Sequence, residues 1–185
     1  MHRRPYMFLR IALLATMAAP QLAPSGRATA SECLIPPVVA PVAEPFHMPS
    51  CQYCAGQRGI GFATKPGATV MAAASGSVTF SGSVAGTRYV VIRHRDGLRA
   101  TYGRLATVPS DLVAGTSILA GSVVGTATDS MYFGLRDDDP EETPVDPTPL
   151  LGRWRYRARL LPSDGQPSRP PPAPRLVCRN VDQSR

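Results

Sequence analysis

Four cysteines and one histidine have the clearest capacity for chemistry. Four of these residues lie between positions 33 and 54, and the last cysteine lies near the C-terminus. His47, Cys51 and Cys54 lie close together, and a C-x-x-C pair beside a histidine is a spacing that zinc ligands use. A second ligand pair is missing, and an even number of cysteines in an exported chain favours disulfides. Four cysteines allow three connectivities, of which Cys33 with Cys178 and Cys51 with Cys54 are the natural pairs.

The first thirty residues have the composition of a secretory signal peptide. A basic start at Arg3 and Arg4 precedes an apolar stretch over residues 11–23, and residues 28–30 read Ala-Thr-Ala, a small-x-small cleavage site. The apolar run is shorter than the roughly 20 residues of a membrane-spanning helix. We therefore expect a secreted, extracytoplasmic chain that starts near Ser31 and has no stable membrane insertion, with an uncleaved anchor as the alternative.

The charge of the chain disfavours a nucleic-acid-binding protein. Removal of the signal peptide takes away four arginines and no acidic residue, so the formal net charge falls from +7 to +3. Nucleic-acid-binding surfaces need clustered basic residues with interleaved aromatic ones. Four arginines do recur at alternate positions, which is typical of a solvated strand face and, as a second interpretation, of a contact with an anionic polymer. They are Arg153, Arg155, Arg157 and Arg159.

Short β-type segments with glycines at their breaks make up the middle of the chain. No window supports an amphipathic helix of useful length, and Asp96-Gly97 joins two segments in the manner of a hairpin. Because such short strands must pack face to face or curl, we expect an all-β domain with a small sandwich or barrel-like core. The expected strands are Thr69–Ala73, Gly76–Ser81, Tyr89–Arg93, Arg99–Tyr102, Ser117–Leu119, Val123–Ala127 and Met131–Arg136.

Prolines bound this core on both sides. Five prolines in residues 31–50 remove too many amide donors for a helix or a central strand, which predicts an extended lead-in. Six prolines in residues 162–174 predict a polyproline-like linker. The expected organisation is a signal peptide at 1–30, the lead-in at 31–50, one β-core domain at 51–161 and a proline-rich tail at 162–185 that contains Cys178.

A series of short motifs follows in a set order along the core. They are Arg58–Ile60, Pro66–Val70, Ala72–Val78, Val90–His94, Ala100–Leu105, Val113–Gly115, Ala120–Gly125, Tyr132–Arg136 and Val145–Pro147. Each motif alone is unspecific, but the ordered combination over roughly residues 40–161 resembles the lysostaphin-type (M23, LytM-like) peptidoglycan endopeptidases. It particularly resembles an actinobacterial branch in which the last motif ends Gly-Leu-Arg. The resemblance implies the duplicated, all-β core of that family.

The resemblance also implies which positions would bind zinc. Active members use a His, an Asp four residues later and the second His of a His-x-His motif, and the fourth position holds a water that zinc activates. Here these positions hold Gln57, Gly61 and Tyr132, and two supporting histidines fall on Arg104 and Ser130. An amide, a glycine and a phenol are poor zinc ligands. We therefore expect a chain without catalysis, metal or other cofactor.

These replacements favour a non-catalytic module that binds peptidoglycan or regulates a cell-wall hydrolase. Arginine presents a planar fork to carboxylates, and peptidoglycan stem peptides carry several carboxylates. We expect these stem peptides to bind in a groove at the former metal site. The expected groove residues are Gln57, Arg58, Gly61, Tyr102, Arg104, Tyr132 and Arg136.

Two other hypotheses belong to different functional classes. A partner protein, such as a cell-wall hydrolase, would contact the groove or the acidic residues 137–142, which are otherwise typical of a solvated hairpin tip. The other hypothesis is an active zinc metalloendopeptidase with relocated ligands, chosen from His47, Cys51, Cys54 and His94. A disulfide between the two cysteines would count against it, because oxidised sulfurs cannot bind zinc as thiolates. Without that role, His94 is structural.

Overall fold

The computed structural model describes residues 33–51, 53–95, 97–156 and 173–178. No helix occurs within these ranges, and accordingly none that is long and apolar enough to span a membrane. The strands are β1 (Val42–Glu44), β2 (Ile60–Ala63), β3 (Thr69–Met71), β4 (Gly76–Val84), β5 (Thr87–His94), β6 (Leu98–Thr107), β7 (Ser117–Ile118), β8 (Val123–Asp137), β9 (Pro144–Val145), β10 (Arg153–Arg155) and β11 (Arg175–Val177). The expected signal peptide, Asp96 of the expected hairpin turn, most of the proline-rich linker, Arg157 and Arg159 lie outside the described residues.

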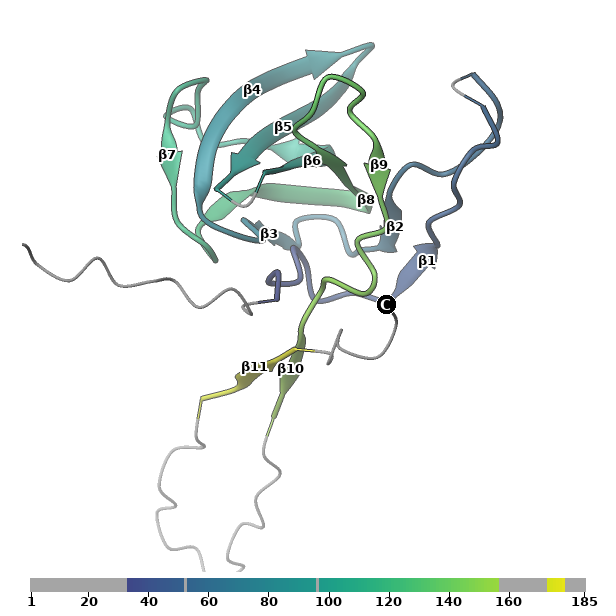
Figure 1. Ribbon diagram of the computed structural model, residues 1–185. Helices are drawn as coiled ribbons and strands as arrows, with labels where there is room; N and C mark the ends of the chain where they lie inside the picture. Colours follow the sequence, from purple (N-terminus) through teal and green to yellow (C-terminus); the bar gives the residue numbers. More distant parts are fainter. Residues whose placement is uncertain (1–32, 52, 96, 157–172, 179–185) are drawn as a thin grey trace, which may run out of the picture. The chain divides into compact units, whose positions relative to one another are not determined.

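Nine strands form one antiparallel sheet in the order β1-β2-β8-β6-β5-β4-β7. One edge of β8 pairs with β6, and its other edge pairs in turn with β3, β2 and β9. Figure 1 shows that the sheet is strongly curved, with β4 bent around the interior. A curved sheet can bury one of its faces against itself, which confirms the expected all-β, barrel-like core.

The core follows from strict alternation along the central strands. Side chains at every second position point inward, as the two-residue period of a strand requires. The rings of Tyr102 and Phe133 pack with their centroids 5.3 Å apart. The buried apolar residues of the four strands β2, β5, β6 and β8 are Ile60, Phe62, Val90, Ile92, Ala100, Tyr102, Leu105, Val124, Ala127, Met131, Phe133 and Leu135. The opposite face of the same strands is left to carry the groove described below.

The proline-rich lead-in contains the short strand β1 and contributes to the core. Leu34 and Val38 are buried, and the amide of Met71 donates to the carbonyl of Pro37 at 2.8 Å. Further along, β1 pairs with β2 at the end of the sheet. Prolines are tolerated beside an edge strand because one of its sides needs no amide donors. The lead-in thus brings Glu44, the last residue of β1, next to the central strands.

The expected strands agree with β3 to β8 in place, with two differences. Val123–Ala127 and Met131–Arg136, expected as two strands, form the single long strand β8. The strand β2 was not expected, because its four residues read Ile-Gly-Phe-Ala and the first three are all buried. A strand buried on both faces shows no alternation of polar and apolar residues. The strands β1 and β9 were not expected either, because three and two residues are too few to show an alternation.

Two disulfides join the four cysteines. Cys33 is bonded to Cys178 and Cys51 to Cys54, with Cα separations of 5.2 and 5.0 Å, which confirms the two pairs that the sequence favoured. The first bond lies beside Gly152, where a Cβ atom would come within 2.6 Å of the Cys33 sulfur. It therefore ties the C-terminal strand β11 to the lead-in.

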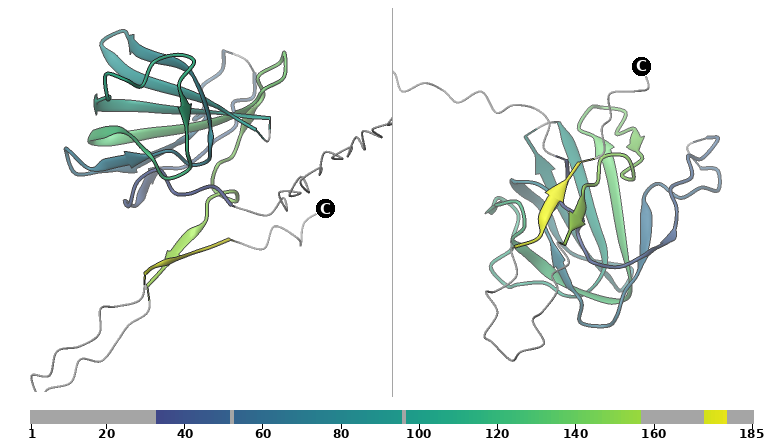
Figure 2. Two further views of the ribbon diagram at one scale, coloured as in Figure 1. Left: turned by 90° about the vertical axis from the view of Figure 1, so that its left-hand side faces the viewer. Right: turned by 90° about the horizontal axis from the view of Figure 1, so that it is seen from below.

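β10 and β11 form a separate two-stranded sheet (Figure 2). A two-stranded ribbon is marginal by itself, so the neighbouring disulfide helps to hold it. Arg153 and Arg155 share one exposed face with their cross-strand partners Val177 and Arg175. Trp154 and its partner Leu176 are half-buried on the other face. The alternation expected for the arginines is therefore present at the two of them that the structure describes.

Candidate binding groove

Five residues form one row across five neighbouring strands, on the face opposite the core. Glu44 is the Cα partner of Gly61, Gly61 of Tyr132, Tyr132 of Gly103, and Gly103 of Tyr89. Large and small residues alternate along this row. The tyrosine rings and the carboxylate therefore rise from a floor in which glycines provide the space between them.

The glycines allow the tyrosine rings to lie close to the backbone. A Cβ atom on Gly103 would lie 2.6 Å from the ring of Tyr89. A Cβ atom on Gly134 would lie 2.6 Å from the hydroxyl of Tyr132, and one on Gly59 would lie 2.7 Å from the same oxygen. These distances are too short for any real side-chain carbon, so larger residues would push the rings out of the groove.

Arg104 reaches the groove because β6 contains a β-bulge. Tyr102 and Leu105 are both buried in the core although they are three residues apart, which regular alternation does not allow. The register against β8 shifts between Gly103 and Leu105, and Arg104 has a φ angle of 59°. A bulge places one extra residue on the strand and redirects its side chain. The left-handed backbone at a non-glycine residue is uncommon, and here it puts the guanidinium beside the row.

Glu44 supplies a carboxylate to the groove. Its Oε1 accepts a hydrogen bond from Nη1 of Arg104 and its Oε2 accepts one from Nε2 of Gln57, both at 3.0 Å. The carboxylate also covers Gly61, where a Cβ atom would lie 2.5 Å from Oε2. The hydrogen bond from Arg104 holds the pKa of Glu44 below its ordinary value and raises the pKa of Arg104. An ion pair thus occupies the space above Gly61.

The groove encloses about 390 Å³, and a second cavity of about 600 Å³ adjoins it at Arg136. The second cavity passes Arg58 and lies between the Cys51–Cys54 loop and the β8–β9 loop. Burial raises the pKa of the Tyr132 phenol, so this hydroxyl is neutral near pH 7. The first cavity is lined by Gln57, Tyr89, Thr101, Arg104, Tyr132, Gly134 and Arg136.

The expected groove residues fall in three places. Gln57, Arg104, Tyr132 and Arg136 line the first cavity, Arg58 lines the second, and Gly61 lies in the row beneath Glu44. Ser130 pairs with Ala63 at the end of β2 and is not among the residues that line either cavity. The structure thus brings together most of the residues that were expected in the groove.

Tyr102 was expected in the groove, and that expectation is wrong. Its side chain is fully buried on the core face of β6, and its hydroxyl accepts a hydrogen bond from the amide of Ala73 at 2.7 Å. Tyr89, on the neighbouring strand, takes the place expected for it. The alternation of β5 could have indicated Tyr89, because the apolar Val90 and Ile92 occupy the opposite face.

The donor atoms of this site do not match those that zinc requires. The amide nitrogen of Gln57 donates to Glu44, Gly61 has no side chain, and the phenol of Tyr132 is kept protonated by burial. The carboxylate of Glu44 is bound to a guanidinium, which competes with any cation. Within the described ranges, no three His, Cys, Asp or Glu side chains are placed to hold a metal ion. No catalytic step through zinc follows from these residues.

The relocated ligand set is likewise not assembled. Cys51 and Cys54 are joined to each other, so neither sulfur is a thiolate. His94 is buried in the sheet, with its Nδ1 3.2 Å from the carbonyl oxygen of Ser75. His47 is exposed and pairs with Gln57 through its backbone. His47 and the Cys51–Cys54 disulfide thus belong to the loop before β2, whereas His94 lies in β5.

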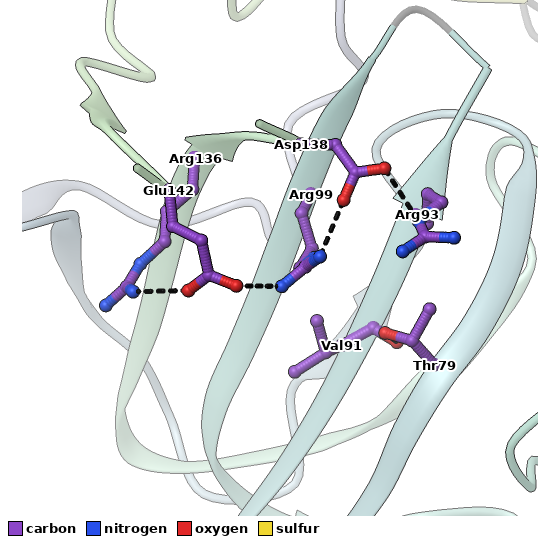
Figure 3. Close-up of polar contacts among 7 residues, drawn as sticks. All are labelled: Thr79, Val91, Arg93, Arg99, Arg136, Asp138 and Glu142. Carbon is purple, nitrogen blue, oxygen red and sulfur yellow. Dashed lines mark hydrogen bonds and ion pairs between the residues drawn. The ribbon is translucent and has the colours of Figure 1, made fainter. Parts of the chain in front are cut away.

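A second row on the same face consists of three arginines. Arg93 is the Cα partner of Arg99, and Arg99 of Arg136. Asp138 accepts bonds from Nε of Arg93 at 2.8 Å and Nη2 of Arg99 at 2.6 Å (Figure 3). Glu142 binds Arg99 and, at 3.2 Å, Nη1 of Arg136. Like charges at paired positions repel each other, and these two carboxylates relieve the repulsion. The expectation of a solvated acidic tip is therefore wrong for Asp138 and Glu142.

Comparison with known proteins places this fold and groove in a family. Residues 55–147, half of the chain, match the family model described as Peptidase family M23. The uncharacterized protein Rv2891 of Mycobacterium tuberculosis is 30% identical over 135 residues, which cover 68% of this chain and 53% of that protein. The uncharacterized protein Mb2915 of Mycobacterium bovis matches equally. The chain therefore spans about half the length of these curated relatives.

Solved structures share the fold at lower sequence identity. Helicobacter pylori Csd3 aligns with a TM-score of 0.56 and 24% identity, over 64% of this chain and 34% of that one. The catalytic domain of lysostaphin from Staphylococcus simulans aligns with a TM-score of 0.51 and 18% identity, over 60% and 90%. A chain in the SpoIIQ–SpoIIIAH pore-forming complex aligns with a TM-score of 0.54 and 20% identity, over 65% and 91%. With the family model matching half of its length, this chain belongs to Peptidase family M23.

Proposed function

We propose that this chain is a non-catalytic M23 domain that binds peptidoglycan in its groove. One observation carries the proposal. The space above Gly61, which the sequence motifs align with a metal-ligand position of the family, holds an ion pair between Glu44 and Arg104. A groove that lacks the donors for a metal and offers hydrogen-bond donors instead is suited to holding a ligand without cutting it.

The side chains of the groove match the chemistry of peptidoglycan stem peptides. These peptides carry free carboxylates, and Arg58, Arg104 and Arg136 present guanidinium groups along the two adjoining cavities. Tyr89 and Tyr132 add flat surfaces with a polar end, which are common in sites for small polar ligands. These groups support a ligand with a carboxylate, which would compete with Glu44 for Arg104 and with Glu142 for Arg136.

The proposal includes an extracytoplasmic location. Two disulfides persist in an oxidising compartment, and four bonded cysteines in a chain of this size are rare in a reducing one. The sequence of residues 1–30 has the three regions of a signal peptide. Both observations support export toward the cell wall.

Co-sedimentation with isolated peptidoglycan sacculi tests this function. We expect the purified protein to pellet with sacculi and to release no soluble fragments. Arg104→Asn should reduce binding about tenfold, because a hydrogen bond from a charged group contributes about 1.5–3 kcal/mol, and asparagine tolerates the left-handed backbone. Arg95→Gln, a change at an exposed arginine outside both cavities, is the matched control. Absence of binding would refute the proposal, and fragment release that a chelator abolishes would restore the enzyme hypothesis.

Regulation of a cell-wall hydrolase is the second candidate function. Tyr53 is 92% exposed and Met48 is 47% exposed, and both belong to the loop region around the Cys51–Cys54 disulfide. Exposed apolar residues at the mouth of a cavity are typical of protein contacts. A neighbour in fold was solved as the SpoIIQ–SpoIIIAH complex. This role predicts that the protein changes the rate at which a purified hydrolase digests sacculi, and that Tyr53→Ser abolishes the change.

A further inference from the structure

We infer that Arg104 and Gln57 form a binding site for the terminal carboxylate of a peptide, and that Glu44 occupies this site as an internal substitute. The inference deepens the proposed function and rests on it for the source of the peptide. It names the group that the groove recognises and the residue with which a ligand must compete.

The geometry around Glu44 is that of a carboxylate-binding site. Two donors from different parts of the chain meet the two oxygens of one carboxylate, each at 3.0 Å. A guanidinium and an amide are the donors that recognise carboxylates in proteins. A terminal peptide carboxylate has the same two oxygens as the side chain of Glu44, so the same donors would bind it.

Both donors are held in position by the backbone. The bulge in β6 fixes the direction of Arg104. Gln57 is fixed by two backbone hydrogen bonds with His47, at 2.8 and 2.9 Å. Because these features do not involve Glu44, the backbone that carries both donors keeps its position when Glu44 leaves. Preorganised donors bind a ligand with less loss of entropy than mobile ones.

Glu44 is held much less firmly than its two partners. It ends β1, an edge strand of three residues whose register against β2 is irregular between Val42 and Glu44. The side chains of Glu44 and Arg104 are 45% and 36% exposed, and ion pairs with this exposure are weak. A ligand carboxylate can therefore replace Glu44 while the central strands remain paired.

The other residues that line the cavity determine which residues of the ligand can precede its terminal carboxylate. Tyr89, Thr101 and Tyr132 line the space beside the donors, next to the backbone of Gly134. This space of about 390 Å³ admits one or two small residues between the tyrosine rings. The ligand class is therefore a short peptide with a free carboxyl terminus and small terminal side chains.

The test uses N-acetyl-D-alanyl-D-alanine with a free carboxylate and the same dipeptide as its terminal amide. Binding is measured by NMR titration of the unaltered protein, of Glu44→Gln and of Asp111→Asn. Asp111 is an exposed acid outside the groove, so its change is the matched control for loss of one negative charge. We expect Glu44→Gln to bind the free acid about fivefold more tightly than the unaltered protein, because a neutral amide competes less well than a carboxylate for Arg104. The terminal amide should bind the unaltered protein and Glu44→Gln equally weakly.

Two further variants keep the test decisive. Glu44→Ala serves if Glu44→Gln does not fold, and Glu44→Gln combined with Arg104→Asn should lose the gain. Equal affinity of Glu44→Gln and Asp111→Asn, or equal binding of acid and amide, would overturn the inference. Sacculi binding without any response to Glu44 would leave the proposed function standing and refute this site. Dipeptide binding without sacculi binding would do the reverse.

Discussion

The carboxylate of Glu44 lies 3.0 Å from the guanidinium of Arg104, although 60 positions separate the two residues in the sequence. The carboxylate covers Gly61, where a Cβ atom would lie 2.5 Å from Oε2 of Glu44. Pairing between β1 and β2 therefore brings a carboxylate from the lead-in to a guanidinium that the bulge in β6 directs into the groove.

The first prediction concerns acid stability. Because the folded pKa of Glu44 lies below its ordinary value of 4.5, its ion pair stabilises the fold above about that pH. This contribution is lost as the pH falls through the folded pKa. Urea unfolding should show Glu44→Gln less stable than the unaltered protein by at most about 1 kcal/mol at pH 7, since the pair is half-exposed. The difference should vanish in acid, once the pH lies below the folded pKa of Glu44, and a difference that grows in acid would contradict the assignment.

The sequence predicted the fold better than the groove, for physical reasons. Alternation and turn residues report local backbone preference, so β3 to β8 were found. Glu44 was missed because its role depends on pairing between β1 and β2, and nothing local distinguishes it in a proline-rich segment. Tyr102 was misplaced because a motif match gives a position along the chain but not the face of the strand. The alternation between Ala100 and Tyr102 would have placed it in the core.

The acidic loop shows the same limit in another way. A run of acidic residues is typical of a solvated tip. That local pattern does not show that Arg93, Arg99 and Arg136 lie next to the loop. These arginines are distant from one another in sequence, and only strand register places them in one row. The contacts of Asp138 and Glu142 could be predicted once that register was known.

The second prediction tests this arginine row. Glu142→Gln removes the negative charge that pairs with Arg99 and Arg136 and leaves adjacent positive charges unbalanced. We expect a loss of about 1 kcal/mol in the free energy of unfolding at low salt. The loss should shrink in about 1 M salt, where the screening length falls to about 3 Å. Glu141→Gln, in the same loop, is the control and should change stability little. Equal effects of the two substitutions would show that the row does not depend on Glu142.

The third prediction concerns the glycines beneath the tyrosine rings. Gly103→Ala places a carbon 2.6 Å from the ring of Tyr89, which must move or strain the sheet. Such overpacking costs about 1–3 kcal/mol, measurable by thermal or urea unfolding. Tyr89→Ser removes the ring, so the double variant should lose less stability than the sum of the two single variants. Additive losses would mean that the ring and the glycine do not share this space.

The fourth prediction separates the two tyrosines that the sequence assigned to one groove. Tyr102 is buried and its hydroxyl is bonded to the amide of Ala73, so Tyr102→Phe leaves that amide without its partner. A buried polar group that loses its hydrogen bond costs about 1–3 kcal/mol. We expect lower stability for Tyr102→Phe and unchanged sacculi binding per folded molecule. Tyr132 lines the cavity, so Tyr132→Ser should weaken binding more than Tyr102→Phe does. If Tyr102→Phe weakened binding while the fold kept its stability, the core position of Tyr102 would not describe its role, and the groove would have to extend through the sheet at β6.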